Sequence, residues 1–386
     1  PFSIHTENGS DEVLETSTRR VSEFKSATWS SRMYRGIAMT TRGNSPENSA
    51  GACLHRPRRL RRTGVIRDLV AETALPPQRL VLPLFIVEGE NVREPIATLP
   101  GVDRVSVDEA SRDIGAALEL GVGAFALFPK IPDDRKSRDA SAALDEDGLV
   151  CRAVRTLRAQ AAETCLITDV ALDPYSSDGH DGIVDGGRVL NDETVDMLAT
   201  MASAHARAGA DFVAPSDMMD GRVRAIRRRL DGQGHTETGI ISYAAKYASS
   251  FYGPFRDALG SAPVERPGVP ADKKSYQMDP ANADEALREA ELDEEEGADV
   301  LLVKPALPYL DVVSRIAARR RLPVAAYHVS GEHAMLRFAA EKGAVEYRPA
   351  LAESLISIAR AGARMIFTYG ALDYADWWRR RHGIGA

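Results

Sequence analysis

Cysteine is scarce in this sequence, with three residues among 386. Cys53, Cys151 and Cys165 are far apart and show no Cys-x-x-Cys spacing. This scarcity excludes a disulfide framework and a zinc cluster built on paired thiolates. It fits a protein of a reducing compartment.

Long hydrophobic runs and a positive net charge are also absent. No apolar run approaches the ~18 residues that a membrane-spanning helix needs. The formal net charge of −7 argues against a general nucleic-acid binder. The one basic run, RPRRLRR at 56–62, is interpreted as an arm that pairs with an acidic surface of its own chain or of a sister subunit. We prefer this to RNA or membrane binding because the rest of the chain is acidic.

The first 54 residues lack an apolar period and are rich in Ser, Thr, Asn and Arg. We therefore predict a disordered leader at 1–54, followed by an arm at 55–78. Acidic residues up to Glu23 argue against an organelle transit peptide, whereas residues 26–54 hold a single acid, Glu47. The predicted location is the cytoplasm, or a plastid if the leader is a targeting segment.

From residue 64 onward, short apolar runs rich in β-branched residues alternate with longer segments of helical period. The predicted strands are 80–86, 123–128, 165–170, 211–215, 239–243, 299–303, 323–328 and 364–369. The amphipathic segments that predict helices include 107–120, 149–162, 191–208, 283–296, 308–320 and 349–361.

The strands are apolar throughout rather than alternating, which is typical of a parallel sheet covered by helices. Eight such units over about 300 residues predict an α/β fold, a (β/α)8 TIM barrel at 79–386, more than a doubly wound sheet. No GxGxxG motif follows the first strand and no Walker lysine is present, which disfavours dinucleotide and P-loop binding.

Active sites of such barrels lie at the C-terminal ends of the strands. In this chain those ends carry a series of polar side chains: Asp169, Asp173, Ser216, Asp217, Lys246, Lys304, Tyr327, Ser330 and Tyr369. We therefore expect an active site on that face of the barrel.

Two of these residues are lysines at the ends of apolar runs, Lys246 and Lys304. A single one is readily explained as a snorkelling side chain or a structural ion pair. Two at equivalent strand ends, among aromatic residues, favour a chemical role. An apolar environment and a second ammonium both lower the pKa of a lysine from ~10.4, so that a neutral amine can attack a ketone and form a Schiff base. One such lysine suggests an aldolase, and two suggest two carbonyl substrates.

Residues 247–280 are predicted to form one long loop, which in a compact barrel is typically a lid. Arg256, Lys273 and Lys274 on this loop are candidates to bind a substrate carboxylate. Ser330 and Tyr369 could hydrogen-bond a second one.

The stretch DVALDPYSSDGHDGIVDGG at 169–187 places five aspartates around His180. Its composition alone leaves a metal site, an acid–base site and a solvated loop open.

Five motifs together resemble the porphobilinogen synthase (5-aminolevulinate dehydratase) family. They are APSDMMDGRV (214–223), SYAAKYASSFYGPFRDA (242–258), DKKSYQMDP (272–280), LLVKPALPYLD (301–311) and YHVSGE (327–332). The resemblance runs in order from about Arg56 to Trp378. It implies a lyase of heme and chlorophyll biosynthesis that condenses two molecules of 5-aminolevulinate to porphobilinogen with loss of two waters.

The resemblance also implies residue roles. Lys246 corresponds to the lysine that binds the first substrate molecule, and Lys304 to the lysine that binds the second. The implied ligands of the first molecule are Ser330, Tyr369, Ser216 and Asp169, and those of the second are Arg256, Lys273 and Gln277. The family is homo-octameric, and each N-terminal arm embraces a neighbouring subunit, which gives the basic run an interface role. The lid between Arg256 and Asp272 is longer than usual.

Metal use divides the family. One branch has cysteines at the positions of Ala171, Asp173 and Asp181 and binds a catalytic zinc; this chain resembles the aspartate-rich, zinc-independent, magnesium-responsive branch. Asp173 and Asp181 either hold Mg²⁺ or K⁺ or hydrogen-bond the substrate amine, and both readings stay open. Glu289, with Asp293 one helical turn on, matches an allosteric Mg²⁺ site, although a charge run of this kind is otherwise a solvated helix face.

Two other classes of function remain. One is a Schiff-base aldolase acting on a sugar phosphate, which needs a single reactive lysine and a phosphate site near the last two strands. The other is a non-catalytic protein that uses the barrel as a binding scaffold through RPRRLRR.

Overall fold

Eight parallel strands form a closed barrel. The computed structural model describes residues 55–383, so the predicted leader at 1–54 lies outside the described residues. The hydrogen-bonded order is β12-β11-β10-β9-β8-β5-β4-β1, and β12 pairs with β1 to close the ring. The bounds are β1 Leu80–Ile86, β4 Ala124–Pro129, β5 Cys165–Val170, β8 Phe212–Pro215, β9 Gly239–Lys246, β10 Val300–Lys304, β11 Val324–His328 and β12 Met365–Thr368. The predicted (β/α)8 barrel is confirmed, and all eight predicted strands are present.

Burial on both faces explains why these strands are apolar throughout. In β1 every residue is buried. Val81 and Phe85 belong to one core cluster with residues of the other barrel strands, whereas Leu82 and Leu84 pack in a second cluster with the surrounding helices. The barrel thus has an interior core and an outer core between sheet and helices.

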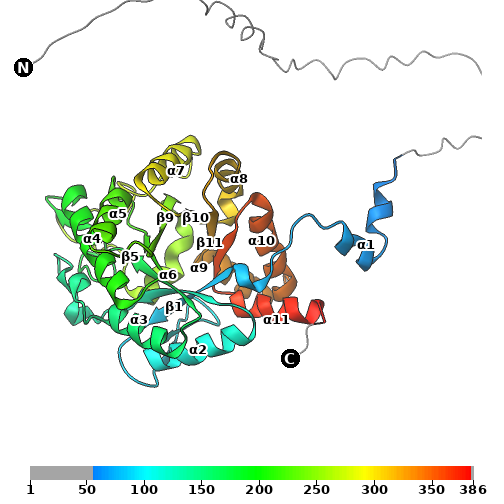
Figure 1. Ribbon diagram of the computed structural model, residues 1–386, viewed down its shortest axis with the longest axis horizontal. Coiled ribbons are helices and arrows are strands. Elements are labelled where there is room, and N and C mark those ends of the chain that lie inside the picture. The colour runs from blue at the N-terminus through cyan, green and yellow to red at the C-terminus, as the bar shows by residue number, and fades with distance from the viewer. Residues whose placement is uncertain (1–54, 384–386) are drawn as a thin grey trace, which may run out of the picture. The chain divides into compact units, whose positions relative to one another are not determined.

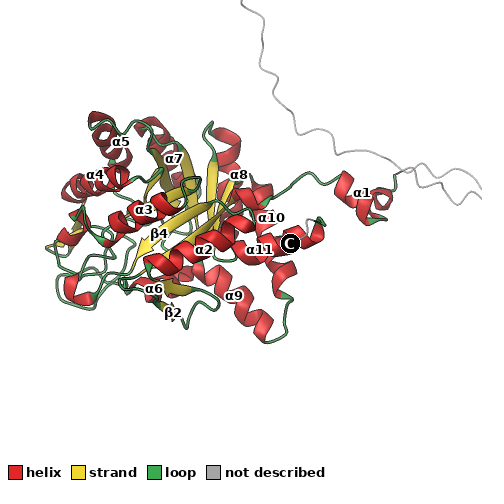
Figure 2. Ribbon diagram, turned by 60° about the horizontal axis from the view of Figure 1, so that its bottom comes forward, coloured by secondary structure: helices red, strands yellow, loops and turns green. Residues whose placement is uncertain are grey.

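The outer helices surround the strands, as Figure 1 and Figure 2 show. Six predicted helices are present: α2 Val107–Glu119, α3 Leu149–Gln160, α4 Asn191–Ala208, α7 Asp284–Glu296, α8 Leu310–Arg319 and α10 Tyr347–Ala361. The further helices are α5 Arg222–Gly232, α6 Gly253–Leu259, α9 Ser330–Glu341 and α11 Ala371–Arg381.

The long loop predicted at 247–280 is partly wrong. Its first part folds into the 3-10 helix η5 Ser250–Tyr252 and the helix α6. Pro254 sits in the first turn of α6, where the missing N–H of proline costs no hydrogen bond. In Figure 1 α6 lies inside the ring of outer helices. The irregular remainder, residues 260–280, is called the lid below.

The other elements are short. They are the 3-10 helices η1 Pro57–Arg61, η2 Pro77–Arg79, η3 Asp133–Arg135, η4 Ser141–Leu144 and η6 Leu307–Tyr309, the helix α1 Gly64–Leu69, and the strands β2 Arg93–Pro95, β3 Asp103–Val105, β6 Ile183–Asp185 and β7 Arg188–Leu190. The chain divides into two compact units, Pro1–Ile66 and Arg67–Ala386, and the barrel lies in the second. No helix in residues 55–383 is long and apolar enough to cross a membrane.

Candidate active site

Lys246 and Lys304 are the last residues of two adjacent strands, β9 and β10. They are paired in the parallel register, so their backbones lie side by side at the C-terminal end of the barrel. Both side chains are buried, with 6% and 4% of their surface exposed. Burial of two lysines at one point is unusual enough to mark a functional site.

Lys246 is held by polar partners. Its Nζ donates to Oδ2 of Asp181 at 2.7 Å and to the backbone carbonyl of Ser216. Ser216 follows β8, the strand next to β9. The ion pair compensates the cost of burying the ammonium.

Lys304 lies in an aromatic environment instead. Its Nζ is 5.2, 5.1, 4.7 and 4.8 Å from the ring centroids of Tyr243, Tyr252, Phe255 and Tyr327, respectively. Burial, followed by the charge of Lys246, lowers the pKa of Lys304 to about 7. A large fraction of Lys304 is therefore a neutral, nucleophilic amine near neutral pH.

Asp181 connects Lys246 with the lid. Its Oδ1 accepts a hydrogen bond from Nζ of Lys273 at 2.5 Å, while its Oδ2 accepts one from Lys246. Asp173 lies 3.4 Å from the same Lys273 Nζ. Burial would raise the pKa of Asp181, but the charges of Lys246 and Lys273 outweigh it and hold this pKa below its usual range.

Asp169 is the second-last residue of β5 and is buried. Burial, and then the charge of Asp173, raises the pKa of Asp169 to about 7, although a hydrogen bond from the Ser216 side chain opposes the shift. Its Oδ1 has no hydrogen-bond partner within residues 55–383. A carboxyl group of this pKa can exchange a proton near neutral pH.

One small cavity joins these groups. Its lining includes nine of the eleven residues predicted to act in catalysis or substrate binding: Asp169, Asp173, Asp181, Ser216, Lys246, Arg256, Lys273, Gln277 and Lys304. The free space at its centre is about 20 Å³, room for about one water molecule. The active site predicted from the strand ends is thus brought together in the fold.

The second-substrate residues reach the cavity from α6 and the lid. Arg256 is half-buried on α6, and its guanidinium has no ion-pair partner within the described part of the chain. Gln277 is buried, and its Oε1 is unpaired within residues 55–383. The sequence reading missed Ser261, a buried residue that also lines the cavity and whose hydroxyl has no partner among the described residues.

Ser330 and Tyr369 do not line this cavity. The Ser330 hydroxyl accepts the backbone N–H of Phe255 at 3.0 Å and lies 3.4 Å from the carbonyl of Phe251. The Tyr369 hydroxyl lies 3.0 Å from that of Tyr327, one of the rings around Lys304. Ser330 therefore contacts Phe255, which lines the cavity, and Tyr369 contacts Tyr327, one of the rings around Lys304.

Comparison with known proteins identifies the family. The model of the delta-aminolevulinic acid dehydratase family matches residues 54–377. The chloroplastic delta-aminolevulinic acid dehydratase of Chlamydomonas reinhardtii is 50% identical over 329 residues, covering 83% of this chain and 84% of the relative. That of Bradyrhizobium diazoefficiens is 49% identical over 321 residues, covering 83% and 90%.

A solved structure supports the same family. It is delta-aminolevulinic acid dehydratase (porphobilinogen synthase) of Toxoplasma gondii in complex with the reaction product porphobilinogen, 51% identical, with a TM-score of 0.81, covering 84% of this chain and 91% of that one. The chain belongs to the delta-aminolevulinic acid dehydratase family. The family and the enzyme class predicted from the sequence, a lyase acting on 5-aminolevulinate, are confirmed.

The two residues of the predicted allosteric metal site, Glu289 and Asp293, differ in their contacts. Asp293 is buried, and its two oxygens accept from the guanidinium of Arg222 at 2.8 and 3.0 Å. Ser242 also donates to Asp293. Because these bonds occupy the carboxylate, Asp293 is a structural ion-pair partner rather than an accessible metal ligand. The pairing of Glu289 with Asp293 in one magnesium site stays a prediction, and a metal ion there would compete with Arg222 for Asp293.

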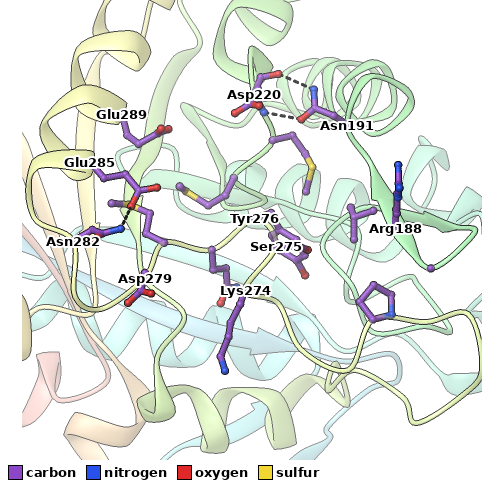
Figure 3. A pocket seen from close by; sticks show the side chains of 17 residues that line it. Arg188, Asn191, Asp220, Lys274, Ser275, Tyr276, Asp279, Asn282, Glu285 and Glu289 are labelled. Atoms are coloured by element: carbon purple, nitrogen blue, oxygen red, sulfur yellow. Dashed lines mark hydrogen bonds between the residues drawn. The ribbon is translucent and has the colours of Figure 1, made fainter.

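Glu289 instead lines a separate cavity of about 610 Å³, shown in Figure 3. Burial raises the pKa of Glu289, against the charge of Arg222. Glu285 and Asp220 line the same cavity; Glu285 accepts from Asn282 at 2.8 Å. Residues 274–279 of the lid form another wall, and its Gln277 lines the active-site cavity as well.

No thiol stands at Ala171, Asp173 or Asp181, the three positions that the resemblance links to zinc. The described cysteines are Cys151 on α3 and Cys165 at the start of β5, away from the strand end that carries Asp169. Burial raises the pKa of both thiols to about 11. Within residues 55–383 no group of three or more His, Cys, Asp or Glu side chains is arranged to hold a metal ion.

Proposed function

We propose that the chain condenses two molecules of 5-aminolevulinate to porphobilinogen through Schiff bases on Lys246 and Lys304. The observation that carries this proposal is the pairing of two buried lysines at adjacent strand ends in opposite environments. An aldolase needs one reactive lysine, whereas this geometry can hold two carbonyl compounds next to each other.

Lys304 supplies the more reactive amine. Its neutral nitrogen forms a bond to the ketone carbon of one substrate, and the ketone oxygen leaves as water after it has accepted protons. Asp169, whose pKa is raised to about 7, is a suitable group to deliver or accept such a proton. Lys246 can attack only as a neutral amine, and its Nζ donates to Asp181 before the substrate binds.

The substrate carboxylates are bound by different parts of the fold. Arg256, Lys273 and Gln277 bind the carboxylate of the second molecule from α6 and the lid, since all three line the cavity. Ser330 and Tyr369 bind that of the first. With room for about one water in the cavity, substrates enter only when the lid and Phe255 move aside.

A magnesium ion acts at Glu289 from outside the active site. The cavity is rich in oxygen ligands, with Asp220 and Glu285 beside Glu289. Mg²⁺ keeps several of its waters and is usually held by one or two carboxylates, so these residues fit it without a closed ligand cage. Residues 274–279 of the lid form one wall of this cavity, and Gln277 also lines the active site. A bound ion would therefore act on the active site through the position of the lid.

Catalysis proceeds without zinc. Asp173 and Asp181 face Lys273 and Lys246, so a Mg²⁺ or K⁺ ion near them would compete with two ammonium groups. Hydrogen bonding of the substrate amine is therefore the role that these carboxylates support better.

The arm at 55–78 joins subunits into a homo-octamer. Leu60, Val65 and Leu69 are 55%, 79% and 82% exposed. Large apolar side chains exposed on one short segment are typical of a surface that another subunit covers. The basic run at 56–62 would pair with acidic residues of that subunit, and neither nucleic acid nor membrane is a partner.

The location is the cytoplasm, or a plastid if residues 1–54 are a targeting segment. Among the relatives, those of plants and green algae are named chloroplastic, whereas the bacterial ones carry no such name. A fluorescent fusion of the first 54 residues tests the plastid alternative.

A colorimetric porphobilinogen assay with 5-aminolevulinate as the only substrate tests the function. We expect product formation that Lys246→Ala and Lys304→Ala abolish. A folded, oligomeric protein that forms no porphobilinogen at any magnesium concentration would support the scaffold alternative and contradict this proposal.

A further inference from the structure

Three consecutive residues of the aspartate-rich stretch, Asp178, Gly179 and His180, contact the lid rather than the catalytic lysines. Asp178 is fully buried, and its carboxylate forms an ion pair with Arg266 of the lid and a longer one, 3.5 Å, with Arg138. Its backbone carbonyl accepts the N–H of Val264 at 3.2 Å. A buried carboxylate needs such partners, so Arg266 ties the lid to the barrel.

Gly179 lets the lid approach the backbone. Its φ is +72°, a conformation that side chains rarely adopt. A Cβ at this position would lie 2.1 Å from the carbonyl oxygen of Ala262 in the lid. Glycine is therefore required here both by the backbone conformation and by direct contact with the lid.

Both ring nitrogens of His180 form hydrogen bonds with residues of the lid. Nε2 lies 2.9 Å from the carbonyl oxygen of Pro270, and Nδ1 lies 3.0 Å from the hydroxyl of Tyr276. Because a carbonyl only accepts, Nε2 carries the proton, and in the neutral ring Nδ1 accepts from Tyr276. The same hydroxyl accepts the backbone N–H of Asp181 at 3.3 Å.

These contacts bracket the part of the lid that reaches the active site. Pro270 and Tyr276 lie on either side of Lys273, whose ammonium binds Asp181 and Asp173. Gln277 follows Tyr276 directly. The ends of this segment are fixed by His180, so the positions of Lys273 and Gln277 over the cavity depend on it.

We propose that Asp178, Gly179 and His180 are positioning residues that hold the lid closed, and that Arg266 is their partner in the lengthened part of the lid. This inference rests on the proposed function of Lys273 and Gln277 as substrate ligands. Asp178 and His180 have no catalytic role in it; they act through the lid.

The test combines lid dynamics with kinetics. Arg266→Gln removes the ion pair at a side chain that is 44% exposed, and buried Asp178 keeps Arg138 as a partner, so the barrel should stay folded at some cost in stability, which urea unfolding measures. Tyr276→Phe removes the hydroxyl bound to His180. For each variant we expect hydrogen–deuterium exchange of peptides covering 262–277 to become roughly tenfold faster. The KM for 5-aminolevulinate should rise roughly fivefold with a smaller change in kcat.

Two controls separate lid contact from general damage. Arg348→Gln breaks a comparable ion pair, with Asp376, at an arginine that is 43% exposed but lies on α10; its exchange and KM should match the wild type. Arg266→Lys keeps the charge and should restore most of the protection. In the double variant Asp178→Asn with Arg266→Gln, exchange should be no faster than in Asp178→Asn alone, because that single variant already loses the ion pair with Arg266 as well as the one with Arg138.

Exchange that stays at the wild-type rate in both Arg266→Gln and Tyr276→Phe would overturn the proposal, whatever happens to KM. Fully additive effects of Asp178→Asn and Arg266→Gln would also overturn it. A wild-type enzyme that made no porphobilinogen would contradict the proposed function alone, since the exchange measurement does not depend on turnover.

Discussion

Lys246 and Lys304 are register partners on adjacent strands, yet one is held by a carboxylate and the other by aromatic rings. Lys246 donates to the carboxylate of Asp181 at 2.7 Å. The aromatic environment of Lys304, together with the neighbouring ammonium, favours the neutral amine. The two lysines are therefore prepared for different steps although their positions in the fold are equivalent.

Lys304→Ala should abolish turnover, with kcat reduced by at least about 10³-fold, because the second Schiff base cannot form. The variant removes a buried amine without an ion-pair partner, so stability should change little. Porphobilinogen formation and urea unfolding check the two parts. A variant that keeps a tenth of the wild-type activity would contradict the assigned role.

The rate of adduct formation at Lys304 should rise with pH and level off above about pH 7, where its amine is neutral. The charge of Asp169 raises the pKa of Lys304. Asp169→Asn should therefore shift the rising part of this pH profile, the limb, to lower pH. Single-turnover trapping between pH 5 and 9 measures the profile. A limb that moves to higher pH in Asp169→Asn would show that the electrostatic assignment is wrong.

Asp181→Asn should lower the free energy of unfolding by about 3 kcal/mol, because Lys246 stays buried without its carboxylate. The pKa of Asp181 in the folded state lies below its usual 3.8. The contribution of the pair is therefore fully present above that value and is lost as the pH falls through the folded pKa. Urea unfolding at pH 7 and at pH 3 should show a smaller difference between variant and wild type at the lower pH.

Asp196→Asn is the control for Asp181→Asn. Asp196 also pairs with a basic residue, Arg229, at 2.9 Å, but it is 78% exposed. Exposed pairs contribute little, so this variant should lie within about 0.5 kcal/mol of the wild type. Equal effects of the two substitutions would contradict the view that burial makes the Asp181 pair important.

Glu289→Ala should reduce magnesium stimulation and shift the oligomer distribution while Schiff-base formation at Lys304 is kept. Activity after chelation, with magnesium and zinc added back separately, is the measurement, combined with analytical ultracentrifugation. Asp293→Ala should instead destabilise the barrel, because buried Arg222 would keep only its longer ion pair with Asp217, at 3.9 Å. A zinc requirement that survives in magnesium-replete buffer would refute the metal assignment.

The barrel could be predicted from the sequence because each strand is apolar on both faces and several helices end in glycine next to a strand. The strand ends place Asp169, Lys246 and Lys304 at one cavity, because the ends of parallel barrel strands meet on one face. Arg256, Lys273 and Gln277 reach the same cavity from α6 and the lid, and their roles as ligands of the second substrate molecule are implied by the family resemblance rather than by a local pattern.

Other features depend on contacts that a local pattern does not show. Arg222 and Asp293 are 71 residues apart, so no pattern in the neighbouring residues indicates that an ion pair occupies Asp293. The helix α6 begins with Gly253 and Pro254, which resemble a turn. The role of His180 requires the lid, about 90 residues further along the chain, to fold back onto it.

Reductive trapping tests the central claim, two Schiff bases on two lysines, most directly. The enzyme is incubated with labelled 5-aminolevulinate and borohydride, digested, and mapped by mass spectrometry. The account predicts adducts on both Lys246 and Lys304, with only the Lys246 adduct left in Lys304→Ala. Label confined to one lysine in the wild type, or found on neither, would contradict it.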